Sequence, residues 1–206
     1  VAKIGDPIPW LFEWPGMLGP IELLGINADG VGVINIAPEI DGVVRRMPTI
    51  MRVGEETYPA MAVETIRVAM GAPSYQIKAD DTGIVAVRVP GYPIINTDQY
   101  GRIWLRYNNT FETVSVTEDL SAVAGKTVVL GLTIEGVGST IATPKGTQYA
   151  HMPIAISLQS VFNGDNPIRT SMADFYELAF LIGIGLILIL GARFTPYWAI
   201  AGGMVV

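Results

Sequence analysis

The pattern of apolar and polar positions over residues 1–170 predicts short strands and two helices. Apolar runs or strand-like alternation predict six strands, at Val31–Ile36, Val43–Val53, Ile84–Val89, Ile94–Thr97, Ile103–Tyr107 and Val128–Leu132. Helical periodicity occurs over Pro59–Met70 and Pro153–Phe162, and a glycine follows each segment. Helices interleaved with buried-type strands predict an α/β fold, with a mixed sheet sandwiched by helices.

Local signals mark turns between these elements. Asp41–Gly42 and Gly54–Thr57 are typical of tight turns, and the second predicts a hairpin. Ser115 and Glu118 have capping-box spacing, which predicts the start of a short helix. Residues 1–30 are rich in Pro, Gly and Trp and predict irregular structure. We expect this segment to lack partners that precede it, and both ends of the chain to be cuts.

The C-terminal part is the most hydrophobic. No charged residue occurs from Leu178 to Ala192, which spans only about 22 Å as a helix against a hydrocarbon core of about 30 Å. Extension back to Met172 adds length and two acidic residues. A second apolar run follows a short turn, so we expect a transmembrane helix over 171–192, a cytoplasmic turn over 193–196 and the start of a second transmembrane helix over 197–206. A buried core helix is the alternative for the first run.

Composition removes several function classes. The chain has a formal net charge of −6, no Cys and one His, His151. An acidic net charge disfavours nucleic acid as a partner. The absence of Cys excludes disulfides and thiolate sites, and a single His excludes multi-His zinc sites. We expect no metal and no cofactor.

The short motifs carry little chemistry. Gly125-Lys126-Thr127 lacks the glycine and the following helix of a phosphate-binding loop. The loop Gly136–Thr140 is not a nucleophile elbow. Arg45 and Arg46 are adjacent on an expected strand, so they point to opposite faces and cannot form one bidentate site. An internal salt bridge is the plainer interpretation, and an anion-binding or signalling contact is the alternative.

Several blocks in order resemble the type-two CHASE domain, an extracytoplasmic sensor associated with bacterial cyclases and histidine kinases. The matching residues are Gly32, Asn35, Asp41–Arg46, Pro48, Tyr58-Pro59, Glu64, Ile95–Asp98, Gly101, Tyr107, Phe111, Ser115, Leu120, Gly125-Lys126, Thr133, Gly136, Thr143-Pro144 and Asn163-Gly164. The resemblance covers residues 30–192. One departure is clear, because Met152 and Ile154 stand where the family usually has Glu and His.

The resemblance implies that residues 1–170 are the C-terminal portion of a sensor domain in the periplasm or outside the cell. The receptor would sit in the plasma membrane, with the lipid bilayer and an unknown extracytoplasmic ligand as partners. Its output would be an adenylate or guanylate cyclase, a histidine kinase or a diguanylate cyclase outside this chain. The fragment itself would not be an enzyme, and a homodimer is expected.

Charge, loop position and motif membership select the candidate ligand or signalling residues. They are Arg45, Arg46, Asp98, Arg106, Thr133, Gly136 and Gly138. Two other functions stay open. A membrane-anchored hydrolase would use paired carboxylates such as Asp41 and Asp98. A structural module of a membrane complex would keep Arg45 paired within the fold and lack a pocket of convergent polar groups.

Overall fold

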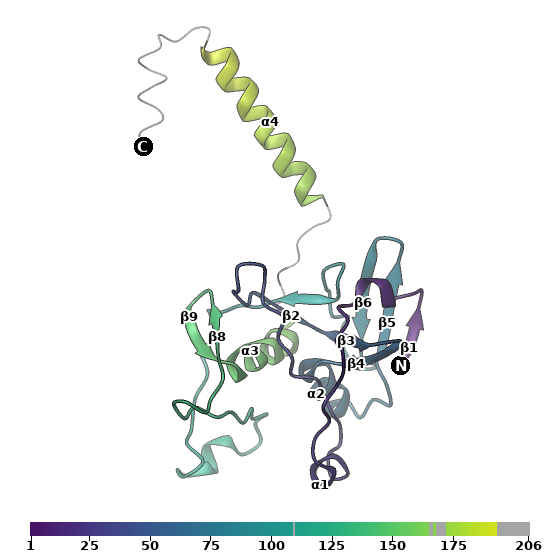
Figure 1. Cartoon of the computed structure of the whole chain (residues 1–206), viewed down its shortest axis with the longest axis vertical. Coiled ribbons are helices and arrows are strands. Elements are labelled where there is room, and N and C mark those ends of the chain that lie inside the picture. The colour runs from purple at the N-terminus through teal and green to yellow at the C-terminus, as the bar shows by residue number, and fades with distance from the viewer. Residues whose placement is uncertain (109, 165–166, 168–171, 193–206) are drawn as a thin grey trace. The chain divides into compact units, whose positions relative to one another are not determined.

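The computed structural model describes the chain except residues 109, 165–166, 168–171 and 193–206 (Figure 1). The chain forms two compact units, Val1–Ile168 and Arg169–Val206. The expected cytoplasmic turn at 193–196 and the second apolar run at 197–206 lie outside the described residues. The assignment of residues 1–170 as the sensor part stays a prediction.

Unit 1 is a mixed α/β fold built from small sheets, which corrects the expectation of one sheet between helices. A three-stranded sheet has the order β1 (Ala2–Ile4), β5 (Gln76–Asp80) and β6 (Gly83–Arg88), with β1 parallel and β6 antiparallel to β5. Three antiparallel pairs complete the described strands: β2 (Arg46–Pro48) with β7 (Arg102–Trp104), β3 (Ile50–Val53) with β4 (Glu56–Pro59), and β8 (Thr140–Thr143) with β9 (Gly146–Tyr149). Among the described strands, no strand pairing joins these four sheets into one continuous layer.

Two helices cover these strands. α2 (Met61–Ala69) and α3 (His151–Phe162) contact each other and lie side by side in Figure 1. Their buried side chains join those of the strands in a single core, whose fully buried members include Val63, Ile66, Ile77, Val87, Ile156 and Val161. The remaining helical elements of unit 1 are one turn long: η1 (Ile8–Trp10), α1 (Glu22–Gly25) and η2 (Leu120–Val123).

The predicted hairpin and the two predicted helices are confirmed. β3 and β4 form the expected hairpin around Gly54. Both long helices of unit 1 occur where the periodicity placed them, and the chain leaves them through Gly71 (φ +59°) and Gly164 (φ +63°). Glycine adopts these left-handed conformations without the steric cost of a Cβ.

Several strand predictions are wrong. Val31–Ile36 and Ile94–Thr97 contribute only single bridges, from Val33 to Ala60 and from Ile95 to Val87. Val128–Leu132 forms no strand, and Leu130 is 80% exposed. An apolar run becomes a buried strand only where a neighbour pairs with it, and no described strand pairs with this run.

The capping prediction near Ser115 is also wrong. The Ser115 carbonyl accepts a turn hydrogen bond from the Glu118 amide, and no helix begins there. The helical turn is η2, and Asp119 caps it by accepting a hydrogen bond from the Ser121 amide at 2.9 Å. Aspartate competes well for this position because its carboxylate accepts from the free amides of a first helical turn.

The segment before β2 is fastened to α2 by a buried acid. Glu64 is 7% exposed and accepts hydrogen bonds from Nε and Nη2 of Arg67 at 2.9 and 2.7 Å. Arg67 Nη2 also donates to the Asp29 carbonyl at 3.0 Å. Gly32 passes so close that a Cβ would lie 2.6 Å from Met61 Cα. Gly32 therefore lies directly against the start of α2, where a larger residue would collide with the helix backbone.

Unit 2 contains α4 (Ala173–Ala192), a helix with exposed apolar side chains around its circumference. Among the described residues, no helix combines the length and hydropathy needed to cross a membrane. The expected transmembrane helix over 171–192 is therefore corrected. The physical reason is length, because the uncharged stretch starts only after Glu177 and spans about 22 Å, against a hydrocarbon core of about 30 Å.

Candidate functional site

A network of two arginines and two carboxylates joins β2 to β7. Arg46 of β2 donates from Nε and Nη2 to the two Glu39 carboxylate oxygens, each at 2.5 Å. Its Nη1 donates to Asp98 Oδ2 at 3.0 Å. The same guanidinium lies 4.9 Å from the ring centroid of Trp104, which is its partner in the β2–β7 register. Arg46 is therefore fixed on three sides.

Asp98 extends the network to a second arginine. Its Oδ2 also accepts from Arg102 Nε at 2.9 Å, while Oδ1 accepts from the backbone amides of Tyr100 and Arg102 at 3.0 and 2.9 Å. These bonds shape the turn that leads into β7. The Arg102 guanidinium lies 5.1 Å from the Tyr100 ring centroid. We call Glu39, Arg46, Asp98 and Arg102 the Arg46 network.

The Arg46 network is partly buried and formally neutral. Its side chains are between 18% and 26% exposed. The hydrogen bonds from Arg46 lower the pKa of the Glu39 carboxyl, against the opposing effect of burial, and the same contacts raise the pKa of Arg46. Two charges of each sign satisfy one another, so the network acts first as a cross-link between two strands and two turns.

Arg45 makes a separate ion pair, as the alternation of side chains along a strand predicts. It bonds to Asp41 through both terminal nitrogens, at 2.9 and 2.7 Å, and both side chains are exposed. The hydrogen bond from Arg45, followed by that from the Val43 amide, lowers the pKa of Asp41 to about 2. Both Arg45 and Arg46 therefore form salt bridges within the fold, as the plainer interpretation of the sequence expects.

These pairings bear on the open alternatives. Asp41 and Asp98 bind different arginines, so the structure offers no support for a pair of free carboxylates that act as acid and base. Arg45 is paired within the fold, as the structural-module alternative expects. In the described part of the chain, no group of three or more acidic or His side chains is placed to hold a metal ion.

The other candidate residues lie in exposed segments. Arg106 is exposed after β7. The Thr133 carbonyl accepts a hydrogen bond from the Tyr149 hydroxyl at 2.6 Å, Gly136 has a φ of +77°, and a Cβ on Gly138 would lie 3.0 Å from the Tyr149 ring. Residues 133–138 therefore form a turn held against β9. Within the described residues, no hydrogen bond or ion pair joins that turn to the Arg46 network.

The start of α3 shows what replaces the usual family residues. Ile154 is 8% exposed and packs in the core, and Met152 is half-buried. His151 stacks on Tyr149, with ring centroids 5.9 Å apart and an interplanar angle of 12°. The departure from Glu and His therefore leaves an apolar, structural start to this helix.

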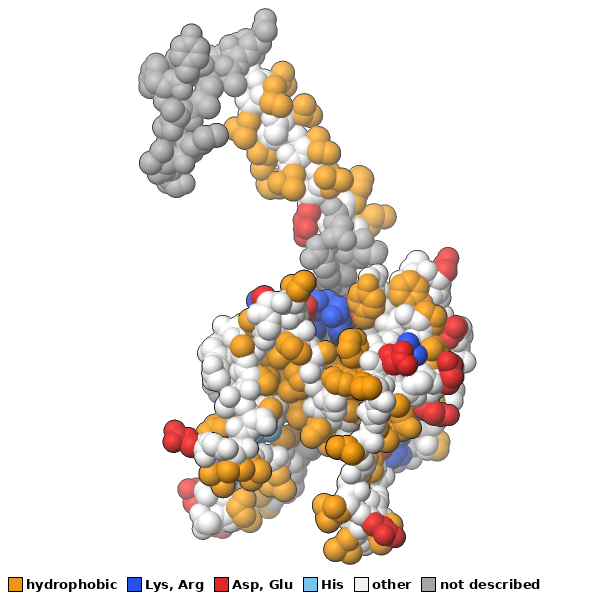
Figure 2. Space-filling view, viewed as in Figure 1, with side chains coloured by type: hydrophobic (Ala, Val, Ile, Leu, Met, Phe, Trp, Pro, Cys, Tyr) orange, Lys and Arg blue, Asp and Glu red, His pale blue; other side chains and the backbone are white. Residues whose placement is uncertain are grey.

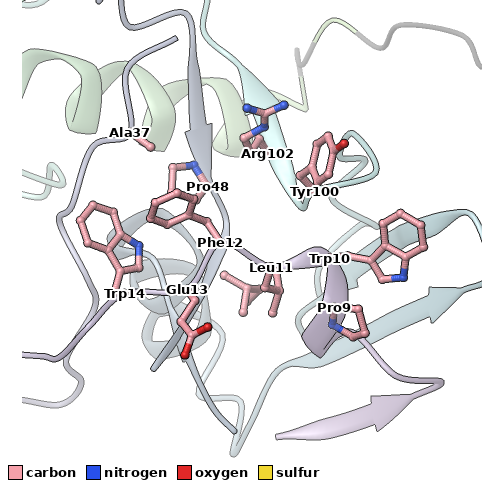
Figure 3. Close-up of a pocket in the computed structure, with 11 residues that line it drawn as sticks. Pro9, Trp10, Leu11, Phe12, Glu13, Trp14, Ala37, Pro48, Tyr100 and Arg102 are labelled. Carbon is pink, nitrogen blue, oxygen red and sulfur yellow. The ribbon is translucent and has the colours of Figure 1, made fainter. Parts of the chain in front are cut away.

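A pocket of about 450 Å³ lies beside the Arg46 network (Figure 3). Phe12, Trp14 and Pro48 lie on one side of it, and Trp10 lies on the other. Tyr100 and Arg102 border it, so that one member of the Arg46 network also lines the pocket. The remaining lining residues are Pro9, Leu11, Glu13, Ala37 and Ile50.

The N-terminal segment builds this pocket by running along β3. The Trp14 amide donates to the Arg52 carbonyl at 2.9 Å, and Arg52 Nε donates to the Leu11 carbonyl at 3.1 Å. Leu11 turns into the core and is 4% exposed. Phe12 and Trp14 meet edge to face, with centroids 5.1 Å apart, at the pocket wall.

The sequence does not predict this pocket, because the Pro, Gly and Trp content of residues 1–30 indicates irregular structure. A partial signal was present in the aromatic residues Phe12 and Trp14, which are two positions apart. Alternate residues of an extended segment point to the same side, and these two rings do meet, whereas Trp10 ends the short helix η1 and lies across the pocket. The facing wall comes from β2 and the turn before β7, and no spacing in the sequence shows that these segments meet.

Comparisons with known proteins identify one family. The family model described as the CHASE2 domain matches residues 7–191. The match begins upstream of residue 30, where the resemblance in the sequence analysis starts, and so includes the aromatic wall of the pocket. Neither the curated proteins nor the solved structures contain a match.

Proposed function

Because the chain belongs to the CHASE2 family of sensory domains, which are not catalytic themselves and typically form extracellular parts of signalling receptors, we propose that it is the input domain of a bacterial membrane receptor. The domain lies in the periplasm or outside the cell, and the receptor lies in the plasma membrane. Its output is a nucleotide cyclase, a histidine kinase or a diguanylate cyclase. The observation that carries this proposal is the family match over residues 7–191.

A lipid bilayer is the proposed partner of α4. The apolar side chains of this helix are exposed all around it, and such a helix is stable where it is surrounded by apolar material. Glu177 and Tyr176 precede the uncharged stretch and fit the polar interface. Insertion of the uncharged part into lipid would hold unit 2 at the membrane.

A homodimer is the proposed assembly. Two segments of unit 1 expose large apolar side chains in series: Leu18, Ile21, Leu23, Leu24 and Ile26 around α1, and Val128, Leu130, Leu132, Ile134 and Val137 before β8. Figure 2 shows hydrophobic side chains gathered over the α1 segment. Exposed apolar side chains that gather in a segment are typical of interaction sites. A Leu130→Asp variant should weaken self-association, and light scattering of the purified protein measures it.

The experiment that tests the input role joins the chain to the catalytic domain of a nucleotide cyclase and measures cyclic nucleotide formation in membranes. We expect Arg46→Met to change the output, because it removes the link between β2, Glu39 and Asp98. Arg45→Met is the matched control, since its ion pair is exposed and separate. Circular dichroism must show that each variant is folded at the assay temperature. Equal output from both folded variants and the unchanged chain would contradict the proposal.

A further inference from the structure

The pocket between residues 9–14 and the β2–β7 pair has the size and lining of a small-molecule site. Its volume of about 450 Å³ falls within the range of roughly 300–1,000 Å³ that is common for ligand pockets. Four aromatic rings, from Trp10, Phe12, Trp14 and Tyr100, line it together with aliphatic and proline side chains. A planar apolar group would bury its faces against such walls.

The charged groups at the pocket point to an anion. Glu13 is already paired with Arg52, at 2.9 Å, so its carboxylate is neutralised. Arg102 is the cation of the lining. Within the described part of the chain, its side chain donates a hydrogen bond from Nε, to Asp98, which leaves the two terminal nitrogens to donate to a ligand. A positively charged ligand would meet the like charge of Arg102.

Arg102 is also held in a fixed orientation. The bond from Nε to Asp98 and the contact with the Tyr100 ring restrain the guanidinium before any ligand arrives. Preorganisation of this kind lowers the entropy lost on binding, and an arginine fork matches a carboxylate in two parallel hydrogen bonds.

We propose that this pocket binds a small aromatic carboxylate, with the ring among Trp10, Phe12 and Trp14 and the carboxylate at Arg102. The inference rests on the proposed input role, because it names the chemical class of the signal. It also gives the signal a route into the fold. A carboxylate bound at the terminal nitrogens of Arg102 would share this guanidinium with Asp98, and Asp98 also accepts a hydrogen bond from Arg46 of β2.

The test uses the whole chain in detergent micelles, labelled with ¹⁵N at tryptophan, with single Trp→Phe variants to assign the signals. The indole N–H signals of Trp10 and Trp14 report on the pocket, and that of Trp104 reports separately on the Arg46 network, because its ring lies against Arg46. Phenylacetate and 1-naphthylacetate serve as one-ring and two-ring aryl carboxylates. Phenethylamine and 2-phenylethanol replace the carboxylate by a cation and by a neutral group, and acetate removes the ring.

We expect both aryl carboxylates to shift the Trp10 and Trp14 signals saturably, and acetate and phenethylamine to leave them unchanged. Arg102→Gln should weaken phenylacetate binding by about tenfold or more and leave 2-phenylethanol binding unchanged, because only the carboxylate uses the guanidinium. Phe12→Ala, at an exposed side chain, should weaken binding of every aromatic probe. Arg88→Gln, an exposed arginine on β6, is the matched control and should bind like the unchanged chain.

Three results would overturn the inference: no saturable shift with either aryl carboxylate, equal binding of phenethylamine, or unchanged binding by the Phe12→Ala protein. Each of these would leave the cyclase output and its dependence on Arg46 untouched, so only the ligand class would fall. Binding of phenylacetate without any change in cyclase output would retain the site and count against the input role.

Discussion

Removal of Arg46 should destabilise unit 1 far more than removal of its neighbour Arg45. Arg46→Met leaves the carboxylates of Glu39 and Asp98 at positions that are about one-fifth exposed, and Glu39 without its bidentate partner. Loss of one partner from a buried pair costs about 3–5 kcal/mol, and partial exposure reduces that cost. We expect about 2–4 kcal/mol, which lowers the Tm of a domain of this size by roughly 5–15 °C.

The pH dependence of stability tests the interaction between Arg46 and Glu39 independently. Arg46 lowers the pKa of Glu39 in the folded protein, below its usual value of 4.5. A carboxyl with a lowered folded pKa stabilises the fold above the unfolded pKa, and this contribution is lost as the pH falls through the folded pKa. The Tm difference between the unchanged chain and Arg46→Met should therefore be full near pH 7 and narrow as the pH falls below 4.5.

Thermal unfolding followed by circular dichroism measures both effects, in the same detergent for all variants. Arg45→Met serves as the control, because Arg45 and Asp41 are exposed and salt screens such pairs. A Tm loss in Arg45→Met as large as that in Arg46→Met would refute the assignment of the Arg46 network as the cross-link. A Tm gap that stays constant from pH 7 to pH 3 would refute the role of Glu39 in it.

Three further predictions concern the body of the domain. Gly32→Ala should lower the free energy of unfolding by about 1–3 kcal/mol, because the new Cβ would lie 2.6 Å from Met61 Cα. Chemical denaturation measures this loss, and Gly16→Ala, at a position with open space around it, is the control. Ile66→Ala should cost about 2–5 kcal/mol by the same assay, since Ile66 is fully buried in α2, and a cost below about 1 kcal/mol would contradict its place in the core. Burial raises the pKa of Tyr75 and Tyr107 to about 12, so ultraviolet titration should show two tyrosines that ionise at higher pH than the rest. Their contribution to stability should be lost as the pH rises from about 10 to about 12. Ionisation of all tyrosines near pH 10 while the protein is still folded would be inconsistent with their burial.

The sequence predicted those elements that local chemistry determines. The β3–β4 hairpin follows from Gly54 between two apolar runs, and α2 and α3 follow from helical periodicity with a glycine after each. β5 was missed although Gln76–Asp80 alternates polar and apolar residues as a half-buried strand does, and its partner β1 lies more than 70 residues away in the register Ala2 to Gln76.

Val128–Leu132 shows the reverse error. Its composition is that of a buried strand, yet Val128, Leu130 and Leu132 are exposed and no described strand pairs with it. Periodicity reports what a segment could bury and carries no information on whether a partner exists. The same limit explains the sheet architecture, because short strands of similar pattern gave no indication that they would form separate pairs.

The candidate site was predicted in part. Adjacent arginines on opposite faces, and an internal salt bridge as the plainer interpretation, agree with the ion pairs of Arg45 and Arg46. The partner Asp98 lies 52 residues from Arg46, and nothing in the spacing specified that pair. Thr133, Gly136 and Gly138 were chosen for their loop, which in the structure is fastened to Tyr149 and makes no described ion pair with the network.

Determining the compartment in which unit 1 lies is the most direct test of whether this domain receives a signal outside the membrane. The chain contains no cysteine, so a single Ser139→Cys substitution at an exposed position creates one labelling site. A membrane-impermeant maleimide is applied to intact spheroplasts that express the protein, with the cysteine-free chain as the blank and a cytosolic thiol protein as the check for lysis. We expect full labelling of the Ser139→Cys protein in intact spheroplasts. Labelling that appears only after lysis would place the domain inside the cell and contradict it.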